Sequence, residues 1–442
     1  MHASFFYLSV PSSLPSTKPI AMKRCLLFFA ALVFAIPAYP QFSLEGDFRP
    51  RAEFRRGYQR MPNEEDKPAG HISQRSRLIL GFTEDRVTTR LSLQDVRIWG
   101  DQMPLTDVPS FDLHEAWIQL ALTDSLFIRA GRQEIRYDNQ RLFAINDWNN
   151  VAQKHDALLL RYLGRSGELH VGAAFNQNTA RQFGTEYGRA NYKTLNYIWY
   201  KTALATNLDV SLMAVADGYE SEWGNSTLYV RGTWSAFLNY RLANLAINVN
   251  PAFQHGTNAY GNNIRAAYFM LEASANPKDN VRSTLGFEWL SGNDFTDLDE
   301  TFRAFDPLYG AGHTVHGYMD YFTNILVHTK GAGLINPYFK NNIRLSERSS
   351  LDVDFHLFYL QNNYPDLAGM PQTFGETLRT LDKYLGTEVD LTLNYRFNAF
   401  TQLTFGYSVM FGTESMEAIK GGDKDEFAHW AFVMLRVRPK FL

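Results

Sequence analysis

The sequence predicts an all-β protein, a transmembrane antiparallel β-barrel of about eighteen strands that occupies residues 41–442. Segments in which apolar and polar residues alternate recur throughout this region, as expected for strands with two different faces. The connections between these segments are short and long in turn. After the N-terminus, no apolar run approaches the ~20 residues that a membrane helix needs. The negative mean hydropathy is compatible with a barrel, because only every second strand residue faces lipid.

Residues 1–40 are predicted to be an upstream lead and a secretory signal peptide. A basic pair precedes the apolar run 25–36, and Met22 is a candidate initiator. A membrane-anchoring helix is the alternative, but the run is too short for one. The single cysteine, Cys25, lies in this segment, so an exported mature chain would need no disulfide.

About eighteen segments fit the strand pattern. They are 43–54, 72–82, 87–98, 114–122, 126–138, 156–162, 169–176, 192–204, 208–216, 227–241, 246–253, 264–274, 281–290, 337–344, 351–360, 384–397, 400–411 and 427–438. Tight turns such as 83–86 and 164–167 alternate with long connections such as 177–191 and 291–336. This alternation is typical of outer-membrane barrels of the porin type, whereas a soluble β-sandwich would not be expected to show it.

The two faces of the predicted strands differ in polarity. In 227–241, Leu228, Val230 and Trp234 share one phase, while Arg231 and Asn239 share the other. The segments 351–360 and 384–397 divide in the same way. A charged face would be costly to bury but is solvated when it lines a water-filled channel. The apolar face is therefore expected to contact lipid, and barrel closure leaves no open strand edge in the membrane.

Charged residues on the polar phase are the candidate lining of a solute pathway. Arginines attract carboxylates and phosphates, and acidic residues supply the opposing charge. The facing direction within 126–138 stays open, because its arginines cannot all point one way in a regular strand. The alternative is that these charges pair with one another and only support the wall. The candidates are Arg75, Arg77, Arg90, Arg97, Glu115, Arg129, Arg132, Glu134, Arg136, Arg141, Arg161, Arg231, Glu288, Asp352, Asp354, Glu388 and Asp390.

Enzymatic motifs are not found in the sequence. It contains no G-x-S-x-G, no H-E-x-x-H and no phosphate-binding loop, so we expect no catalytic residues, no metal and no cofactor. The net charge of -3 gives no support to nucleic-acid binding.

An ordered series of motifs resembles the alginate export family of outer-membrane porins. The resemblance implies a monomeric eighteen-stranded barrel with an arginine-rich pore, through which an anionic polyuronate diffuses out. The motifs are 95–100 (DVRIWG), 113–116 (LHEA), 131–133 (GRQ), 141–142 (RL), 147–148 (DW), Asp156, 291–294 (SGND), 312–313 (GH) and 317–320 (GYMD).

The predicted function is a passive, non-enzymatic channel in the outer membrane of a Gram-negative bacterium. We expect it to be anion-selective and to pass an alginate-like acidic polysaccharide or oligosaccharide, with the loop 291–336 gating the outer mouth. Outer-membrane lipid, the polysaccharide and periplasmic export components are the expected partners of a monomer. The alternatives are a general or nutrient-uptake porin and, less favoured, an outer-membrane hydrolase.

Overall fold

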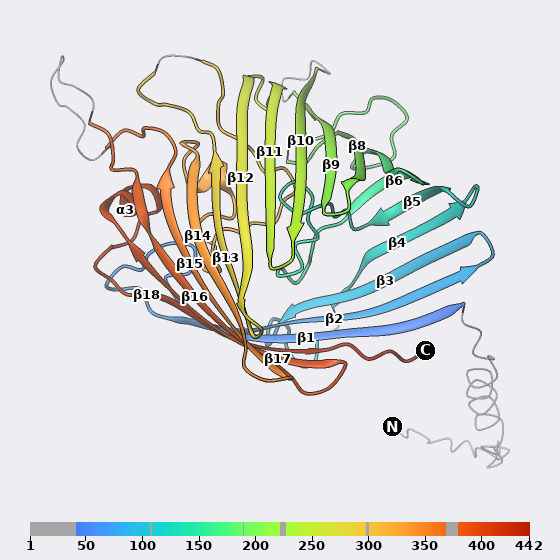
Figure 1. Cartoon of the computed structure of the whole chain (residues 1–442), viewed down its shortest axis with the longest axis horizontal. Coiled ribbons are helices and arrows are strands. Elements are labelled where there is room, and N and C mark those ends of the chain that lie inside the picture. Colours follow the sequence, from blue (N-terminus) through green and yellow to red (C-terminus); the bar gives the residue numbers. More distant parts are fainter. Residues whose placement is uncertain (1–40, 107, 189, 222–226, 298–299, 368–378) are drawn as a thin grey trace, which may run out of the picture.

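A computed structural model shows one closed barrel of 18 antiparallel strands (Figure 1). It describes residues 41–442 except 107, 189, 222–226, 298–299 and 368–378. The predicted signal peptide therefore lies outside the described residues. The elements are β1 Phe42–Arg56, β2 Ala69–Glu84, β3 Val87–Ile98, β4 Phe111–Ala121, β5 Leu126–Gln133, β6 His155–Gly164, β7 Gly167–Phe175, β8 Thr194–Ala205, β9 Leu208–Glu220, β10 Leu228–Leu242, β11 Leu245–Thr257, β12 Asn263–Lys278, β13 Val281–Leu290, α2 Ile325–His328, β14 Leu334–Arg344, β15 Ser349–Leu360, β16 Tyr384–Arg396, β17 Thr401–Gly412, α3 Glu414–Lys420 and β18 Ala428–Val437.

Each strand pairs with its neighbours in the sequence, and β1 closes the ring by pairing with β18. The closing register places Phe54 opposite Ala431 and Arg51 opposite Met434. Every backbone edge in the wall is thereby paired, as a barrel in lipid requires. None of the helices in the described part of the chain has the length and hydropathy of a membrane-spanning helix. The predicted transmembrane barrel of about eighteen strands is confirmed.

The outward face is apolar and the inward face is polar. Phe355, Leu357 and Leu391 point outward and are each about two-fifths exposed, which a lipid bilayer would cover. On the same two strands, Glu388 and Asp390 point inward and are buried. Outward aromatic and aliphatic side chains thus form the membrane contact, and the charged side chains belong to the lumen.

Strand β5 is shorter than the sequence pattern predicted. It ends at Gln133, although the alternation of side chains continues to Tyr137. Ile135 and Tyr137 are buried because the chain leaves the wall and turns into the lumen. The alternation in 134–137 therefore marks a segment with a buried side inside the barrel and not a longer strand.

Two long loops, 134–154 and 291–333, fold into the barrel and contact each other. The N–H of Ala144 donates to the carbonyl of Tyr309 at 2.9 Å, and that of Ala311 donates to the carbonyl of Gln140 at 2.9 Å. Phe143 is fully buried, 5.4 Å from the ring of Tyr309. The lumen therefore has an aromatic core of its own, and many charges expected to be solvated are covered by protein.

Three glycines in the wall make room for aromatic rings of a neighbouring strand. A Cβ on Gly172 would lie 2.1 Å from the ring of Tyr197, and one on Gly286 would lie 2.0 Å from the ring of Tyr338. A Cβ on Gly406 would lie 1.8 Å from the ring of Phe432. These glycines let inward aromatic rings lie flat against the barrel wall.

Gly172→Ala should destabilise the barrel by roughly 1–3 kcal/mol, the usual cost of overpacking. The Tyr197 ring cannot retreat easily, because the rings of Tyr137 and Phe143 lie 5.6 and 5.3 Å from it. Urea unfolding of protein in vesicles, followed by gel migration without boiling, would measure the change. Gly188→Ala is the matched control, since a Cβ there meets nothing within 4 Å. Equal midpoints for the two variants would contradict the steric argument.

Candidate channel constriction

Asp147 anchors the inward loop 134–154 to the barrel wall. Its carboxylate lies 2.8 Å from Arg75 on β2, 2.9 Å from Arg436 on β18 and 3.4 Å from Arg49 on β1. Burial alone would raise the pKa of Asp147, but the three guanidinium groups outweigh it and hold the pKa below its ordinary value. The loop is thus held across the place where the first and last strands meet.

A second carboxylate, Asp47 on β1, completes this arginine cluster. It lies 2.7 Å from Arg75, 2.8 Å from Arg436 and 3.7 Å from Arg438. Arg438 is also 3.9 Å from Asp147, and its side chain is 56% exposed. With Arg49, four arginines share two carboxylates. The cluster therefore has an excess of positive charge that faces the lumen at Arg438.

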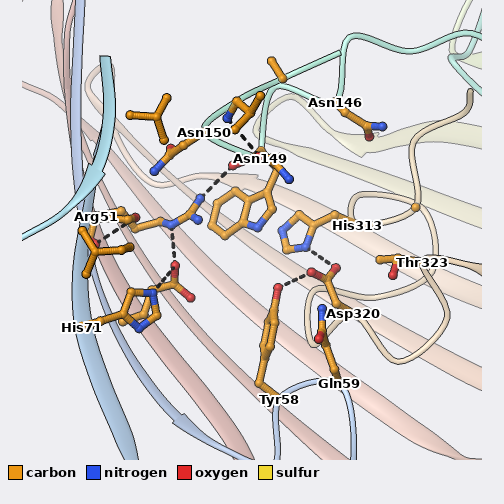
Figure 2. Close-up of a pocket in the computed structure, with 18 of the residues that line it drawn as sticks. Arg51, Tyr58, Gln59, His71, Asn146, Asn149, Asn150, His313, Asp320 and Thr323 are labelled. Carbon is orange, nitrogen blue, oxygen red and sulfur yellow. Dashed lines mark hydrogen bonds and ion pairs between the residues drawn. The ribbon is translucent and has the colours of Figure 1, made fainter. Parts of the chain in front are cut away.

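Trp148, the next residue of the same loop, lies between a cation and a second loop. The guanidinium of Arg51 lies 3.9 Å from the centre of its ring, and the ring of His313 stacks on it at 4.1 Å. Two groups so close to one centre must occupy opposite faces, and Figure 2 shows Arg51 and His313 on either side. This stack joins β1, loop 134–154 and loop 291–333, and its cation–π contact adds to the anchor at Asp147.

The stack borders a cavity of about 810 Å³ on the side of the longer loops. Asn146, Asn149 and Asn150 line one part of it, and Tyr58 and Asp320 line another (Figure 2). The hydroxyl of Tyr58 donates to the carboxylate of Asp320. The lining is therefore mixed, with amides, an acid and an aromatic ring around one solvent-accessible space.

His313 also contacts this acid. Its Nδ1 lies 2.7 Å from Asp320, but burial lowers the pKa of the imidazole more than the carboxylate raises it. The neutral ring is thereby favoured, which suits its stacking on Trp148. Among the described residues, no group of three or more His, Cys, Asp or Glu side chains is placed to hold a metal ion.

The opposite wall is acidic and binds the second inward loop through its backbone. Glu388 accepts a hydrogen bond from the N–H of Met319 at 2.7 Å, and Asp390 accepts one from Tyr318 at 3.4 Å. Both carboxylates are buried. A Cβ on Gly317 would lie 2.5 Å from Glu388, so only glycine permits this close approach of the loop.

Glu288 is a third buried acid of this wall. It lies 2.7 Å from Arg141 of loop 134–154 and 2.9 Å from His316 of loop 291–333, and it accepts a hydrogen bond from Tyr268 at 2.6 Å. One carboxylate on β13 thus ties both loops to the wall. Charge compensation, and not solvation, explains why it can be buried.

The other predicted residues mostly form pairs within the wall. Arg90 pairs with Glu115 at 2.6 Å, Arg77 lies 3.7 Å from Glu134, and Arg161 pairs with Glu168 at 2.6 Å. Arg231 forms ion pairs with Asp217 and Asp306, and Asp354 lies 3.4 Å from Lys340. Asp352 accepts hydrogen bonds from the side-chain amides of Asn342 and Asn394. The guanidinium of Arg129 lies over the ring of Trp117.

Not all of the candidates line the lumen. Arg97 lies opposite Gln74, and Arg132 lies opposite Asp156, in the phase of the outward residues, although Arg97 also borders the cavity of about 810 Å³. Each pairs with an aspartate, Arg97 with Asp95 at 2.6 Å and Arg132 with Asp156 at 2.8 Å. Arg136 is exposed in the loop that follows β5. The register thus resolves the facing of 126–138, with Arg129 inward and Arg132 outward.

Sequence reasoning missed several residues of the constriction as site residues. They are Asp47, Arg49, Arg51, Asp147, Trp148, His313, Arg436 and Arg438. A local signal existed for Arg49, Arg51 and Glu53, which occupy successive positions of one phase on β1. Asp147 and Trp148 gave no such signal, because nothing local shows that a polar loop turns inward.

A wide closed barrel with a charged lumen narrowed by inward loops defines a channel of the outer membrane. A family model described as "Alginate export" matches residues 41–200 and 234–426. The chain belongs to this family, and the resemblance predicted from its motifs is confirmed.

Solved structures share the fold at low sequence identity. OccAB4 of Acinetobacter baumannii matches with a TM-score of 0.61 at 12% identity, over 91% of this chain and 98% of that one. OpdL of Pseudomonas aeruginosa matches with a TM-score of 0.61 at 13% identity, over 91% of this chain and 100% of that one. The outer membrane protein OprD of the same species matches with a TM-score of 0.60 at 12% identity, over 90% of this chain and 94% of that one. Comparison with curated proteins yields no match.

Asp147→Asn should loosen loop 134–154 and raise single-channel conductance, because Arg75, Arg49 and Arg436 would lose their shared anion. Because the pKa of Asp147 is lowered, its carboxylate stays charged in the folded protein even at pH values below the ordinary pKa of an aspartate. The anchoring energy is thus complete above the unfolded pKa of about 3.9 and is lost only as pH falls through the lower folded value.

Planar-bilayer recordings from about pH 7 to about pH 4 would measure this effect. The conductance of the variant should be higher than that of the wild type throughout, and the difference between the two should stay constant over that range. Asp124→Asn, on an exposed turn, is the control. A variant with wild-type conductance would show that Asp147 does not set the width of the constriction.

Proposed function

We propose that this outer-membrane channel lets anionic solutes diffuse passively, and that its cargo is an alginate-like acidic polysaccharide or oligosaccharide that is exported from the periplasm. The observation that carries the proposal is the cluster in which Arg49, Arg75, Arg436 and Arg438 share Asp47 and Asp147. An excess of guanidinium groups at the narrowed part of a lumen lowers the barrier for carboxylates. Membership of the alginate export family supports a polyuronate as the particular cargo.

The acidic wall of β13, β15 and β16 gives this channel a transverse polarity. Its carboxylates include Glu288, Asp354 and Glu388, and they face a lumen whose arginine cluster lies on β1, β2 and β18. A carboxylate solute would be drawn to the arginine side of the lumen. Conduction requires binding that is favourable enough for entry and weak enough for release, and Asp47 and Asp147, which already share the guanidinium groups of that side, keep the binding of a solute weak.

Loops 134–154 and 291–333 bring the solute close to the arginines. Because they fill part of the lumen, a passing chain cannot cross in the middle of a wide aqueous pore. The exposed side chain of Arg438 and the partly exposed Arg436 are the cations of the cluster that remain accessible to such a chain. Passage then exchanges contacts of the carboxylates with water for contacts with guanidinium groups.

Arg436→Gln/Arg438→Gln should reduce anion selectivity while leaving the barrel folded. The reversal potential under a salt gradient, measured in planar bilayers, should move toward zero, and block by oligouronates should weaken by about tenfold or more, as for the loss of two charge-assisted contacts. The anchor of Asp147 keeps Arg75 and Arg49 in this variant.

Arg86→Gln is the control, because it removes an exposed charge from the β2–β3 turn. A wild-type channel without anion preference that ignores oligouronates would contradict the proposal and favour a general or nutrient-uptake porin. Release of shortened uronate products by the purified protein would favour a hydrolase instead.

A further inference from the structure

A further group of cations lies close to the short turns of the barrel, at the end where Arg438 follows β18. Outer-membrane barrels have short periplasmic turns and longer external loops, so this end faces the periplasm. A cavity of about 340 Å³ there is formed by β14, β15, β16 and β17, and we call it the β14–β17 cavity. Arg344, Arg348 and Arg396 line it together with the amides of Asn342 and Gln402.

The arginines of the β14–β17 cavity are exposed and weakly engaged. Among the described residues, the side chain of Arg344 donates only to the carbonyl of Asp279, at 3.2 Å, and the side chains of Arg348 and Arg396 have no hydrogen bond or ion pair. Glu347 is the one acidic residue in the cavity lining. The site therefore has an excess of positive charge and free donors.

A second cavity, of about 350 Å³, lies on another side of the same mouth and is called here the β8–β10 cavity. Arg136, Lys201 and Arg241 line it, with the ring of Phe237 beside them. Arg241 pairs with Asp209 at 2.8 Å, whereas Arg136 and Lys201 have no ion-pair partner in the described part of the chain. Here too the exposed cations outnumber those that are neutralised by pairing.

Asp138, which also lines the β8–β10 cavity, is already satisfied by other donors. Asp138 accepts hydrogen bonds from Ser211 at 2.7 Å and from the indole of Trp199 at 3.1 Å. Among the described residues, it forms no hydrogen bond or ion pair with the side chains of Arg136 and Lys201. This contrasts with the constriction, where Arg75 is fully buried and both of its ion-pair partners are fixed.

We propose that the β8–β10 cavity and the β14–β17 cavity are two carboxylate-binding subsites, which capture an acidic polysaccharide chain at the periplasmic mouth. This inference rests on the proposed function and adds the place where the cargo first binds. Each subsite offers guanidinium donors that match a carboxylate, and side-chain amides that match sugar hydroxyls. Phe237 adds an apolar face for a sugar ring.

Two separated subsites suit a polymer better than a single ion. A chain held at one subsite reaches the other at a high effective concentration, so two weak contacts together give useful retention. Exposed charges at a mouth also speed encounter with an oppositely charged chain. Because neither subsite is buried, a bound segment can leave toward the constriction.

Sided block of single channels tests the proposal. Lys201→Gln/Arg241→Gln changes one subsite, Arg344→Gln/Arg396→Gln changes the other, and Arg56→Gln/Arg60→Gln removes two charges beside the external loops as a control. Every protein carries Asn262→Cys, biotinylated, so that block by streptavidin identifies the external side of each inserted channel. The probe is a defined oligouronate added to one side, and calorimetry of detergent-solubilised protein measures its binding at equilibrium.

We expect the frequency of block from the periplasmic side to fall about tenfold in each subsite variant, in line with the loss of electrostatic steering. Block from the external side should stay unchanged, as should both sides of the Arg56/Arg60 control. Calorimetry should show correspondingly weaker binding. Unchanged periplasmic block, or an equal loss in the control, would overturn the two subsites.

These results separate the subsites from the proposed function. An anion-selective wild-type channel whose periplasmic block survives both subsite variants would leave the function standing and refute the subsites. Oligouronate binding that the subsite variants weaken, in a channel without anion selectivity, would do the reverse. A wild type that neither binds nor is blocked by oligouronates would overturn both.

Discussion

The ion pairs of Asp147 with arginines of the wall are the interaction on which the interior of this barrel depends. A barrel of eighteen strands leaves an aqueous lumen unless something fills it. Here one carboxylate draws a loop from β5 across to Arg49, Arg75 and Arg436, and the neighbouring Trp148 then holds the second loop through His313. Removing this charge would leave the buried Arg49 without an ion-pair partner and Arg75 and Arg436 with Asp47 alone, so the loop and the wall stabilise each other.

Charge compensation also decides which residues remain available to a solute. Buried charges such as Arg75 and Glu288 are saturated by partners from the inward loops. Cations near the periplasmic turns, such as Lys201 and Arg396, form no ion pair among the described residues and stay exposed. The charges of the lumen are therefore of two kinds, those that hold the inward loops in place and those that stay accessible to a solute.

The wall could be predicted from the sequence, and the interior could not. Alternation such as Leu391, Leu393 and Tyr395 against Asp390 and Asn394 is a local property that follows directly from the pleat of a strand. Neighbouring strands pair in sequence order, so the number of strands and their order followed as well. The family was predictable because its motifs are short and retain their order along the chain.

The accessibility of each arginine is a property of the folded loops. Arg75 and Arg90 share the inward phase of neighbouring strands, yet Asp147 covers the first while the second is more than one-third exposed. Nothing near either residue in the sequence shows where a distant loop will lie. The end of β5 at Gln133 was missed for the same reason, because burial in the lumen produces the same alternation as burial in a wall.

The pairing of β1 with β18 determines when the constriction can form during folding. Asp47 and Arg436 are separated by 389 residues, so their contact has one of the longest sequence separations that this chain allows. Contacts of this kind form late, because the entropy of closing the chain must be offset before they add stability. Until the last strand arrives, the sheet has two open edges and Asp147 lacks part of its binding site. Ring closure and narrowing of the lumen are therefore a single step, and a chain that ends before β18 would lack both.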